Sequence, residues 1–312
     1  MGRPFALTRE CVRIASSMNA PSPAETRQPA QYAAFVGMSL IWGTTFLAIR
    51  IGNEAVPPLW GATIRLILAA ALNTLVALAT RADWPRGAAL KGIALFGFLN
   101  LGVNFALLYW GEQTVPSGIA ATLYATTPLT TGIFASMLGV HALDRRRMLA
   151  AVVGLAGVAL IFSGELKLGA PAPALLGVFG GATCAALAGV ILKKVPTHSA
   201  FVVNALGAAI GAVICFLASL ALGESHTLPH TMTGWGPIIY LAIAGNLGAY
   251  VLYTWLVGQW KVTRVTVAAL IIPMIAVIVG AIVRGESPAP ITYLGGALVL
   301  CGVAVTLFSG RD

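Results

Sequence analysis

The sequence predicts an all-α integral membrane protein with ten transmembrane helices, arranged as two inverted repeats of five helices. Three observations support this fold class: long apolar segments, basic residues that gather on one side of the membrane, and motifs that recur at a constant offset. Hydrophobic residues make up 58% of the 312 residues and charged residues only 9%, whereas soluble domains contain about 25% charged residues. The apolar runs are continuous and do not alternate with polar residues, which favours helices over a β-barrel.

Ten apolar segments are long enough to cross a bilayer, since about 20 helical residues span about 30 Å of hydrocarbon. We expect helices at 32–51, 57–79, 89–110, 115–138, 147–164, 174–193, 200–222, 235–257, 263–283 and 290–309. Residues 1–31 are polar and contain several prolines, so we expect a disordered cytoplasmic tail there.

Lysine and arginine residues indicate how these helices are oriented. With the N-terminus placed in the cytoplasm, fifteen basic residues fall on the cytoplasmic side, three fall outside, and Arg65 lies within a helix. Cytoplasmic loops of membrane proteins carry an excess of lysine and arginine. The count therefore predicts that both termini are cytoplasmic.

Short motifs recur at an offset of 145–146 residues. The motif at 100–102 returns at 246–248, Pro128 returns as Pro273, and the motif at 157–164 returns at 302–310 with one insertion. We therefore divide the chain into a first repeat at 32–164 and a second at 174–309. Because each repeat has an odd number of helices, the second would be inverted in the membrane. Secondary transporters built this way bind their substrate near the midplane, between the halves.

Three groups of residues carry a family resemblance. They are the run 41–52 with Pro57, Pro58 and Arg65; the segment 115–121 with Thr127 and Pro128; and the pair Gly285-Glu286. Together they resemble the EamA family of the drug/metabolite transporter superfamily, over residues 32–309. The chain departs from the family at 143–145, where members often carry Glu-Arg and this sequence has Leu-Asp-Arg. The resemblance implies a ten-helix permease of the inner membrane, often an exporter of amino acids or other small metabolites.

Polar residues share one face on the third and on the eighth predicted helix. Asn100 and Asn104 are four residues apart, and Asn246, Tyr250 and Tyr253 follow at spacings of four and seven. The repeat aligns Asn100 with Asn246 and Asn104 with Tyr250, so inverted halves would bring both faces to a central cavity. Uncharged amides and phenols suit a neutral or zwitterionic solute. The alternative is hydrogen bonding between helices that only holds the bundle together.

Hydroxyl residues form a stripe on the fourth predicted helix. We place Ser117, Tyr124 and Thr127 on the cavity wall, because hydrocarbon offers hydroxyls no partners. The alternative is that such hydroxyls bond to carbonyls one turn earlier in their own helix. Pro128 and Pro273 each remove a backbone donor from corresponding helices. We predict that these two prolines act as hinges, with static kinks as the alternative.

The second predicted helix contains a charged residue, Arg65, at a depth where a charge costs at least about 2.5–3.5 kcal/mol. One hypothesis is that Arg65 faces the cavity and attracts a substrate carboxylate. The other is a structural arginine, held by helix-end carbonyls or by Glu112. The resemblance favours the structural role, since relatives with varied substrates carry an arginine here. Trp42 and Thr45 on the first helix are further candidates for the cavity wall, although Trp42 would equally pack against a neighbouring helix.

The sequence lacks the motifs of several other classes of protein. It has no HExxH or CxxC motif and no catalytic constellation, so we expect no catalytic residues, no metal, no cofactor and no enzymatic activity. Basic residues are scattered between apolar segments, which argues against nucleic acid as a partner. We expect a small-molecule substrate and membrane lipid as partners, and a monomer or homodimer.

The interpretation is a secondary permease that exports a small polar metabolite by alternating access. The alternatives are a facilitative, channel-like pathway and a non-transporting membrane scaffold. The acidic residues lie in tails, loops or helix ends, which gives little support for a proton relay at the midplane.

Overall fold

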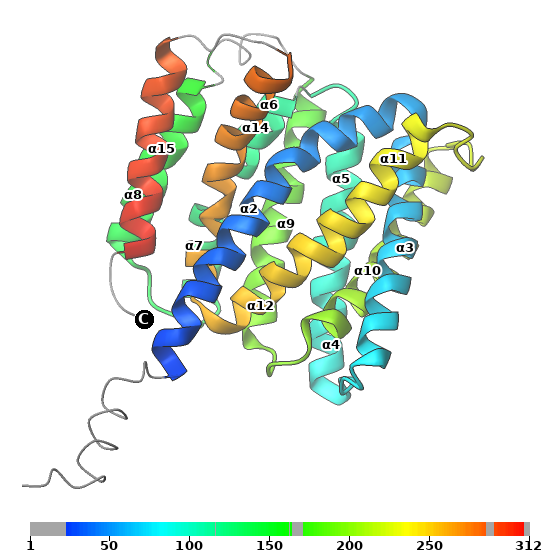
Figure 1. Ribbon diagram of the computed structural model, residues 1–312, viewed down its shortest axis with the longest axis horizontal. Helices are drawn as coiled ribbons and strands as arrows, with labels where there is room; N and C mark the ends of the chain where they lie inside the picture. Colours follow the sequence, from blue (N-terminus) through cyan, green and yellow to red (C-terminus); the bar gives the residue numbers. More distant parts are fainter. Residues whose placement is uncertain (1–22, 116, 162, 164–170, 285–289, 309–312) are drawn as a thin grey trace, which may run out of the picture.

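The computed structural model describes residues 23–115, 117–161, 163, 171–284 and 290–308. Regular secondary structure in these residues is entirely helical, and Figure 1 shows the helices packed lengthwise into one bundle. Six helical stretches in the described part are long and apolar enough to cross a membrane. The other passes of the described part have shorter uninterrupted apolar stretches.

Within the described residues the helices follow one another in ten passes, close to the ten predicted segments. Single helices form six of the passes: α2 (Pro23–Ala55), α3 (Pro58–Ala79), α8 (Arg145–Ile161), α9 (Ala172–Lys194), α10 (Ala200–Ala221) and α15 (Pro290–Phe308). Consecutive pieces form the others: α4 (Gly87–Phe96), η1 (Gly97–Val103) and α5 (Asn104–Gly111); α6 (Ser117–Tyr124) and α7 (Thr127–Met137); α11 (Met232–Tyr240), η3 (Leu241–Tyr250) and α12 (Val251–Gln259); α13 (Val262–Thr266) and α14 (Ala268–Arg284).

The largest difference from the predicted boundaries is at the start of α2. This helix begins at Pro23, so residues 23–31 are helical where we expected a disordered tail. Tertiary contacts provide a reason, because the side-chain oxygen of Gln31 accepts a hydrogen bond of 2.8 Å from Trp260 Nε1. Residues 1–22 and the Gly285-Glu286 motif lie outside the described residues.

The two ends of the described chain lie at the same end of the bundle (Figure 1). The rings of Tyr32 at the start and Phe308 at the close are stacked, with their centroids 6.2 Å apart. Arg264 Nη2 joins both termini, since it donates to the Tyr32 hydroxyl (2.8 Å) and to the carbonyl of Leu307 (2.9 Å). Because the described chain begins and ends at the same end of the bundle, it crosses the bundle an even number of times.

The third and eighth passes both widen into a π-helix at corresponding positions. The π-helix η1 contains Asn100, and η3 contains its repeat partner Asn246. Wide turns of this kind are rare and often occur at functional sites. Both asparagine side chains are buried, at 3% and 1% exposed. The two halves therefore share an irregular helical feature in addition to their sequence motifs.

The loop after α10 determines where α3 begins. The α3 N-terminus has no cap from its own neighbouring side chains, because it starts at Pro57 and Pro58. Glu224 supplies the cap, since its two carboxylate oxygens accept from the backbone N–H groups of Leu59 (3.1 Å) and Trp60 (2.8 Å). A carboxylate at this position satisfies donors that the helix itself leaves unpaired.

Close glycine contacts hold the fifth and tenth passes together. A Cβ atom on Gly157 of α8 would lie 2.5 Å from the carbonyl oxygen of Gly295 in α15. Similarly, a Cβ atom on Gly302 would lie 2.5 Å from the carbonyl oxygen of Ala150. Small residues let helix backbones approach this closely in membranes. The first glycine of each recurring motif thus packs against the helix that carries the other motif.

We expect the substitution Gly302→Ala to destabilise the protein by about 1–3 kcal/mol, because the new methyl group meets backbone atoms that cannot move aside. The measurement is the apparent melting temperature of the purified protein in detergent. Gly296→Ala on the same helix is the control, since its methyl group would make an ordinary contact of 3.6 Å with Met274 Sδ. Equal melting temperatures for the two variants would contradict the proposed backbone contact.

Candidate functional site

Arg65 lies in the middle of α3 and is held by side chains of two other passes. Its Nε donates to Asn246 Oδ1 (2.7 Å), and its Nη1 donates to the Tyr109 hydroxyl (2.9 Å). The guanidinium carbon lies 4.6 Å from the centre of the Phe105 ring. Arg65 is only 2% exposed. The prediction that helix-end carbonyls or Glu112 hold this arginine is wrong, because Asn246 and Tyr109 provide the hydrogen bonds.

No acidic side chain of the described residues forms an ion pair with Arg65. Among the described residues, the ion pair found joins Arg147 to Asp144, far along the chain from Arg65. Asn246 and Tyr109 are neutral acceptors, so they solvate the charge without cancelling it. A buried cation held in this way favours an anion nearby.

A cavity of ≈ 110 Å³ opens beside Arg65, between the two halves of the chain. It lies among α2, α3, the third pass, α6 and α7, α9, the eighth pass, and α13 and α14. Its lining residues are Trp42, Thr45, Phe46, Ile49, Arg65, Asn100, Asn104, Phe105, Leu108, Tyr124, Thr127, Ala185, Tyr250, Tyr253, Thr266, Ala268, Ala269 and Ile272.

Most of the residues predicted for a substrate site line this one cavity. They are Trp42, Thr45, Arg65, Asn100, Asn104, Tyr124, Thr127, Tyr250 and Tyr253. Asn246 lies behind the wall and bonds to Arg65. The side chain of Ser117 lies outside the described residues. Whether the lining residues bind substrate remains a prediction.

Aromatic rings make up much of the wall. Trp42 packs edge-on against Tyr250, with centroids 5.3 Å apart, and lies 5.5 Å from Tyr253. Phe46 packs edge-on against Tyr124 at 5.7 Å. Trp42 thus combines the two roles we considered, because it lines the cavity and also packs against a neighbouring helix.

Sequence reasoning missed Phe46, Phe105 and Tyr109. Phe46 and Phe105 line the cavity, and Tyr109 holds Arg65 from behind it. In the sequence they are indistinguishable from lipid-facing aromatic residues. The available signal was their spacing, since Phe46 is one helical turn from Trp42 and Phe105 is adjacent to Asn104.

Asn104 and Tyr124 connect the third and fourth passes. The Tyr124 hydroxyl donates to Asn104 Oδ1, and Asn104 Nδ2 donates to the carbonyl of Asn100 (2.9 Å). Both groups of the Asn104 amide therefore bond to other protein groups. The alternative interpretation, hydrogen bonding between helices, expected such contacts. Tyr124 and Asn104 hold each other in position on the cavity wall.

The threonine hydroxyls of the fourth pass mostly bond to their own helix. Thr126 donates to the carbonyl of Leu123 (2.6 Å), and Thr130 donates to that of Thr127 (3.1 Å). Thr131 is fully buried, and its hydroxyl has no hydrogen-bond partner among the described residues. The hydroxyl stripe therefore does not face the cavity as a whole. Its cavity-lining members are Tyr124 and Thr127.

Thr127 repairs the hydrogen bond that Pro128 removes. In a continuous helix the N–H of residue 128 would donate to the carbonyl of Tyr124, but proline has no N–H. The Thr127 hydroxyl donates to this carbonyl instead, at 2.5 Å. Here the helix is interrupted between α6 and α7. An unpaired carbonyl at membrane depth would be costly, so Thr127 stabilises the break.

The second half is interrupted at a different position relative to its proline. The break between α13 and α14 falls at Val267, whereas Pro273 lies inside α14. Pro273 gives no N–H to the carbonyl of Ala269, and no side chain of the described residues takes the role that Thr127 has in the first half. Both breaks are next to the cavity, because Thr127 and Thr266 line it. The hinge role of the two prolines remains a prediction.

Glu112 is a buried carboxyl just beyond the last residue of α5. It is 6% exposed, and neither carboxylate oxygen has a hydrogen-bond partner in the described part of the chain. Burial raises the pKa of Glu112 to about 8, although the positive charge of Arg50 opposes the shift. Glu112 is therefore the described acidic group best suited to take up a proton near neutral pH. Among the described residues, no group of three or more potential metal ligands occurs.

We expect Thr127→Val to destabilise the protein by about 1–3 kcal/mol, because it leaves the Tyr124 carbonyl without a donor. Thr127→Ser keeps the hydroxyl and should behave like the wild type. Thr130→Val is the matched control. The Thr130 hydroxyl donates to the carbonyls of Thr127 (3.1 Å) and Thr126 (3.4 Å), and the residue four positions after each of these is a threonine and not a proline. Thermal unfolding in detergent tests this, and equal losses for Thr127→Val and Thr130→Val would refute the repair.

Glu112 should make stability depend on pH. Its folded-state pKa is raised above the ordinary value of about 4.3, so the folded protein binds the proton more tightly and loses stability as the pH rises from about 5 to 8. Glu112→Gln should flatten this dependence and raise the melting temperature most at pH 8. The exposed residue Asp83 supplies the control Asp83→Asn. Identical pH profiles for wild type and Glu112→Gln would show that Glu112 does not bind this proton.

Comparison with known proteins identifies the family. The model of the EamA-like transporter family matches residues 30–163 and again 172–308. An "Uncharacterized inner membrane transporter YedA" of Escherichia coli (strain K12) is 31% identical over 278 residues, which cover 88% of this chain and 90% of the relative. A crystal structure with 20% sequence identity has a TM-score of 0.72 and covers 91% of this chain and 99% of its own, which supports the fold.

Two further relatives have names that describe a substrate. A "Probable amino-acid metabolite efflux pump" of Escherichia coli (strain K12) is 26% identical, with 87% of this chain and 93% of the relative covered. A "Probable terminal-alkyne amino-acid exporter" of Streptantibioticus cattleyicolor is also 26% identical, with 86% and 91% covered. The two family matches together span most of the helical bundle. The chain therefore belongs to the EamA-like transporter family and is a multi-pass membrane transporter, not an enzyme.

Proposed function

We propose that this transporter exports a small solute with a free carboxylate, an amino acid or a close derivative, across the inner membrane. The observation that carries the proposal is the buried cation of Arg65 on the cavity wall, without an acidic partner among the described residues. A substrate carboxylate would supply the missing negative charge. Charge-assisted hydrogen bonds of this kind are stronger than neutral ones.

The remainder of the wall suits the other parts of an amino acid. The face of Trp42 is a favourable surface for an ammonium group. Ala269 also lines the cavity, and we propose its carbonyl, which receives no N–H from Pro273, as a further acceptor. Phe46, Ile49 and Ile272 offer apolar surface for a side chain. We therefore favour a zwitterion with a small or apolar side chain.

The names of two relatives support the same substrate class. Both the Escherichia coli efflux pump and the Streptantibioticus cattleyicolor exporter are described by amino-acid substrates. Their sequence identity of 26% supports the class of solute and leaves the individual compound to experiment. The direction of transport, outward from the cytoplasm, is proposed on the same basis.

Alternating access between two inverted halves is the proposed mechanism. The repeats would comprise residues 32–164 and 174–309, with both termini in the cytoplasm and the protein acting as a monomer or homodimer. Support comes from the π-helices η1 and η3 at corresponding positions and from the helix breaks on both sides of the cavity. Broken helices at a site between repeats are typical of secondary transporters. Bending at Pro128 and Pro273 would open one side at a time.

Counterflow in proteoliposomes tests the proposal directly. Vesicles loaded with an unlabelled amino acid should transiently accumulate the same labelled compound, because a carrier exchanges one solute for another. A channel-like pathway would equilibrate the label without accumulation. Folded protein that shows no counterflow with any amino acid would support the scaffold alternative.

The role of Arg65 has a sharper test that uses substrate analogues. For a compound active in counterflow, Arg65→Gln should weaken apparent affinity at least about 10-fold, as loss of one charged hydrogen bond would. The carboxamide of that compound lacks the charge, so its affinity should hardly change in Arg65→Gln. Equal effects on acid and carboxamide would contradict a contact between Arg65 and the carboxylate.

A matched control separates substrate binding by Arg65 from the contacts that hold Arg65 in place. Tyr109→Phe removes a hydrogen bond to Arg65, yet Tyr109 does not line the cavity. This variant should therefore lower thermal stability while keeping the preference for the acid over its carboxamide. Loss of that preference in Tyr109→Phe would show that Arg65 needs both partners to be positioned for substrate.

A further inference from the structure

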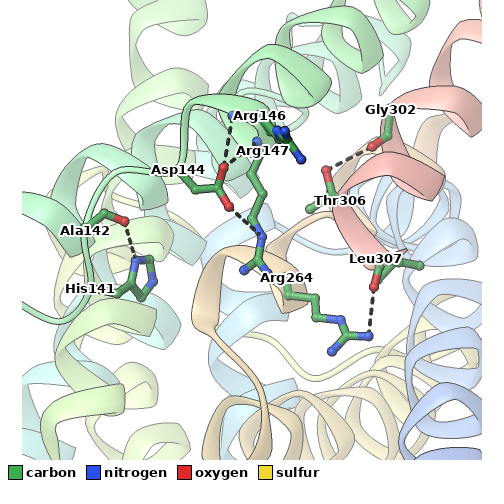
Figure 2. A network of polar contacts seen from close by, with 9 residues as sticks. All are labelled: His141, Ala142, Asp144, Arg146, Arg147, Arg264, Gly302, Thr306 and Leu307. Carbon is green, nitrogen blue, oxygen red and sulfur yellow. Dashed lines mark hydrogen bonds and ion pairs between the residues drawn. The ribbon is translucent and has the colours of Figure 1, made fainter. Parts of the chain in front are cut away.

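A second cavity lies at the end of the bundle where the two termini meet. Its volume is ≈ 280 Å³, and its lining comes from α7, the loop that follows, the start of α8, α13 and α15. Its polar lining residues are His141, Asp144, Arg147, Lys261, Thr263 and Thr306. Figure 2 shows Arg147 and Asp144 together at the start of α8, with His141 on the preceding loop and Thr306 on α15.

The charge of this lining is positive. Arg147 and Lys261 contribute two cations, and Asp144 contributes the one carboxylate of the lining. Asp144 is engaged locally, because its Oδ1 accepts from the backbone N–H groups of Arg146 (2.9 Å) and Arg147 (3.2 Å). Its Oδ2 lies 3.3 Å from Arg147 Nε. Asp144 therefore caps α8 and leaves an excess of positive charge in the cavity.

Two neutral groups of the lining have hydrogen-bonding atoms without a protein partner. The Thr263 hydroxyl is buried, with the residue 8% exposed, and no described group bonds to it. His141 Nε2 is also buried and has no hydrogen-bond partner among the residues that the structure describes. A buried polar atom left unsatisfied is costly, so both positions favour a ligand that can bond to them.

We propose that this cavity binds a compact oxyanion, a carboxylate or phosphate group, between Arg147, Lys261 and the hydroxyl of Thr263. Arginine and lysine are the usual partners of such groups, and a hydroxyl adds a directed donor. The anion belongs either to a soluble solute or to the headgroup of an acidic phospholipid, which basic pockets at helix ends bind in other membrane proteins.

The second cavity lies next to the cavity that Arg65 lines, which we call the transport cavity. On the fourth pass, Thr127 lines the transport cavity and the next residue, Pro128, lines the second cavity. On the ninth pass, Thr266 lines the transport cavity and the next residue, Val267, lines the second cavity. One layer of residues at the two helix breaks thus separates the cavities. If the proposed transport of carboxylates holds, the second cavity is a site where such a solute binds on the cytoplasmic side before it enters the transport cavity.

His141 provides a spectroscopic reporter for the bound anion. Burial lowers the pKa of His141 below its ordinary value, and the charges of Lys261, Arg147 and Lys193 lower it further, against the hydrogen bond to the carbonyl of Ala142. A bound anion would offset these positive charges. The pKa of His141 should therefore rise when the site is filled.

The test is a titration of purified full-length protein with inorganic phosphate and with acetate, in a neutral detergent without acidic lipid. We expect saturable binding, followed by the NMR signal of histidine-labelled protein, with the His141 signal assigned by its loss in His141→Gln. Arg147→Gln and Lys261→Gln should each weaken phosphate binding at least about 10-fold. Arg146→Gln removes the same charge from the neighbouring position, which does not line the cavity, and should change affinity less than about 2-fold.

Further arms identify the source of the anion and protect the test against misfolding. Thr263→Val removes the proposed hydroxyl donor and keeps every charge. It should weaken phosphate binding, and it serves as the second test if Arg147→Gln fails to fold. Binding seen only with phosphatidylglycerol micelles would support the site with lipid as its source. Folded protein that binds neither phosphate, acetate nor phosphatidylglycerol would overturn the proposal. Arg65→Gln should still bind phosphate here, so a failure of the proposed transport activity leaves this site standing.

Discussion

Arg65 joins three passes of the bundle through one buried guanidinium group. It reaches from α3 to Asn246 in η3 and to Tyr109 in α5, and it lies over the ring of Phe105. A cation at membrane depth is tolerated when the protein surrounds it with oriented dipoles and aromatic faces. These contacts determine where the third and eighth passes meet α3. They also leave the charge open to an anion in the cavity.

Satisfaction of backbone polar groups explains the irregular parts of the fold. Hydrocarbon cannot bond to a free carbonyl, so broken helices persist in membranes where protein groups or a cavity receive them. The Thr127 hydroxyl does this for the carbonyl opposite Pro128. In the second half, Ala269 lines the cavity, and no hydroxyl of the described residues bonds to its carbonyl as Thr127 does in the first half. The halves therefore share an architecture but differ in chemistry at the site.

Several basic side chains bond to the ends of helices. Lys193 Nζ donates to the carbonyl of Val257 (2.9 Å), and Lys194 Nζ donates to that of Leu138 (3.1 Å), so both bond to the C-terminal ends of helices. Arg264 Nη2 likewise donates to the carbonyl of Leu307 (2.9 Å), near the end of α15. Cations at helix C-termini satisfy carbonyls that the helix leaves unpaired. Two other basic residues, Arg147 and Lys261, line the second cavity, for which we propose an anion as ligand.

The sequence by itself determined the number and approximate limits of the passes, the family, and half of the residues that line the central cavity. Apolar length, helical spacing and recurring motifs are local properties, so they can be read without coordinates. Only the tertiary structure decided what each polar group faces. Arg65 and Asn246 are 181 residues apart, and nothing in the sequence near either of them names its partner. Thr127 was predicted to face the cavity, but its hydroxyl hydrogen is bonded to the Tyr124 carbonyl. Such partners depend on how distant helices pack, because the free energy of a buried polar group is set by the atoms within about 3 Å of it.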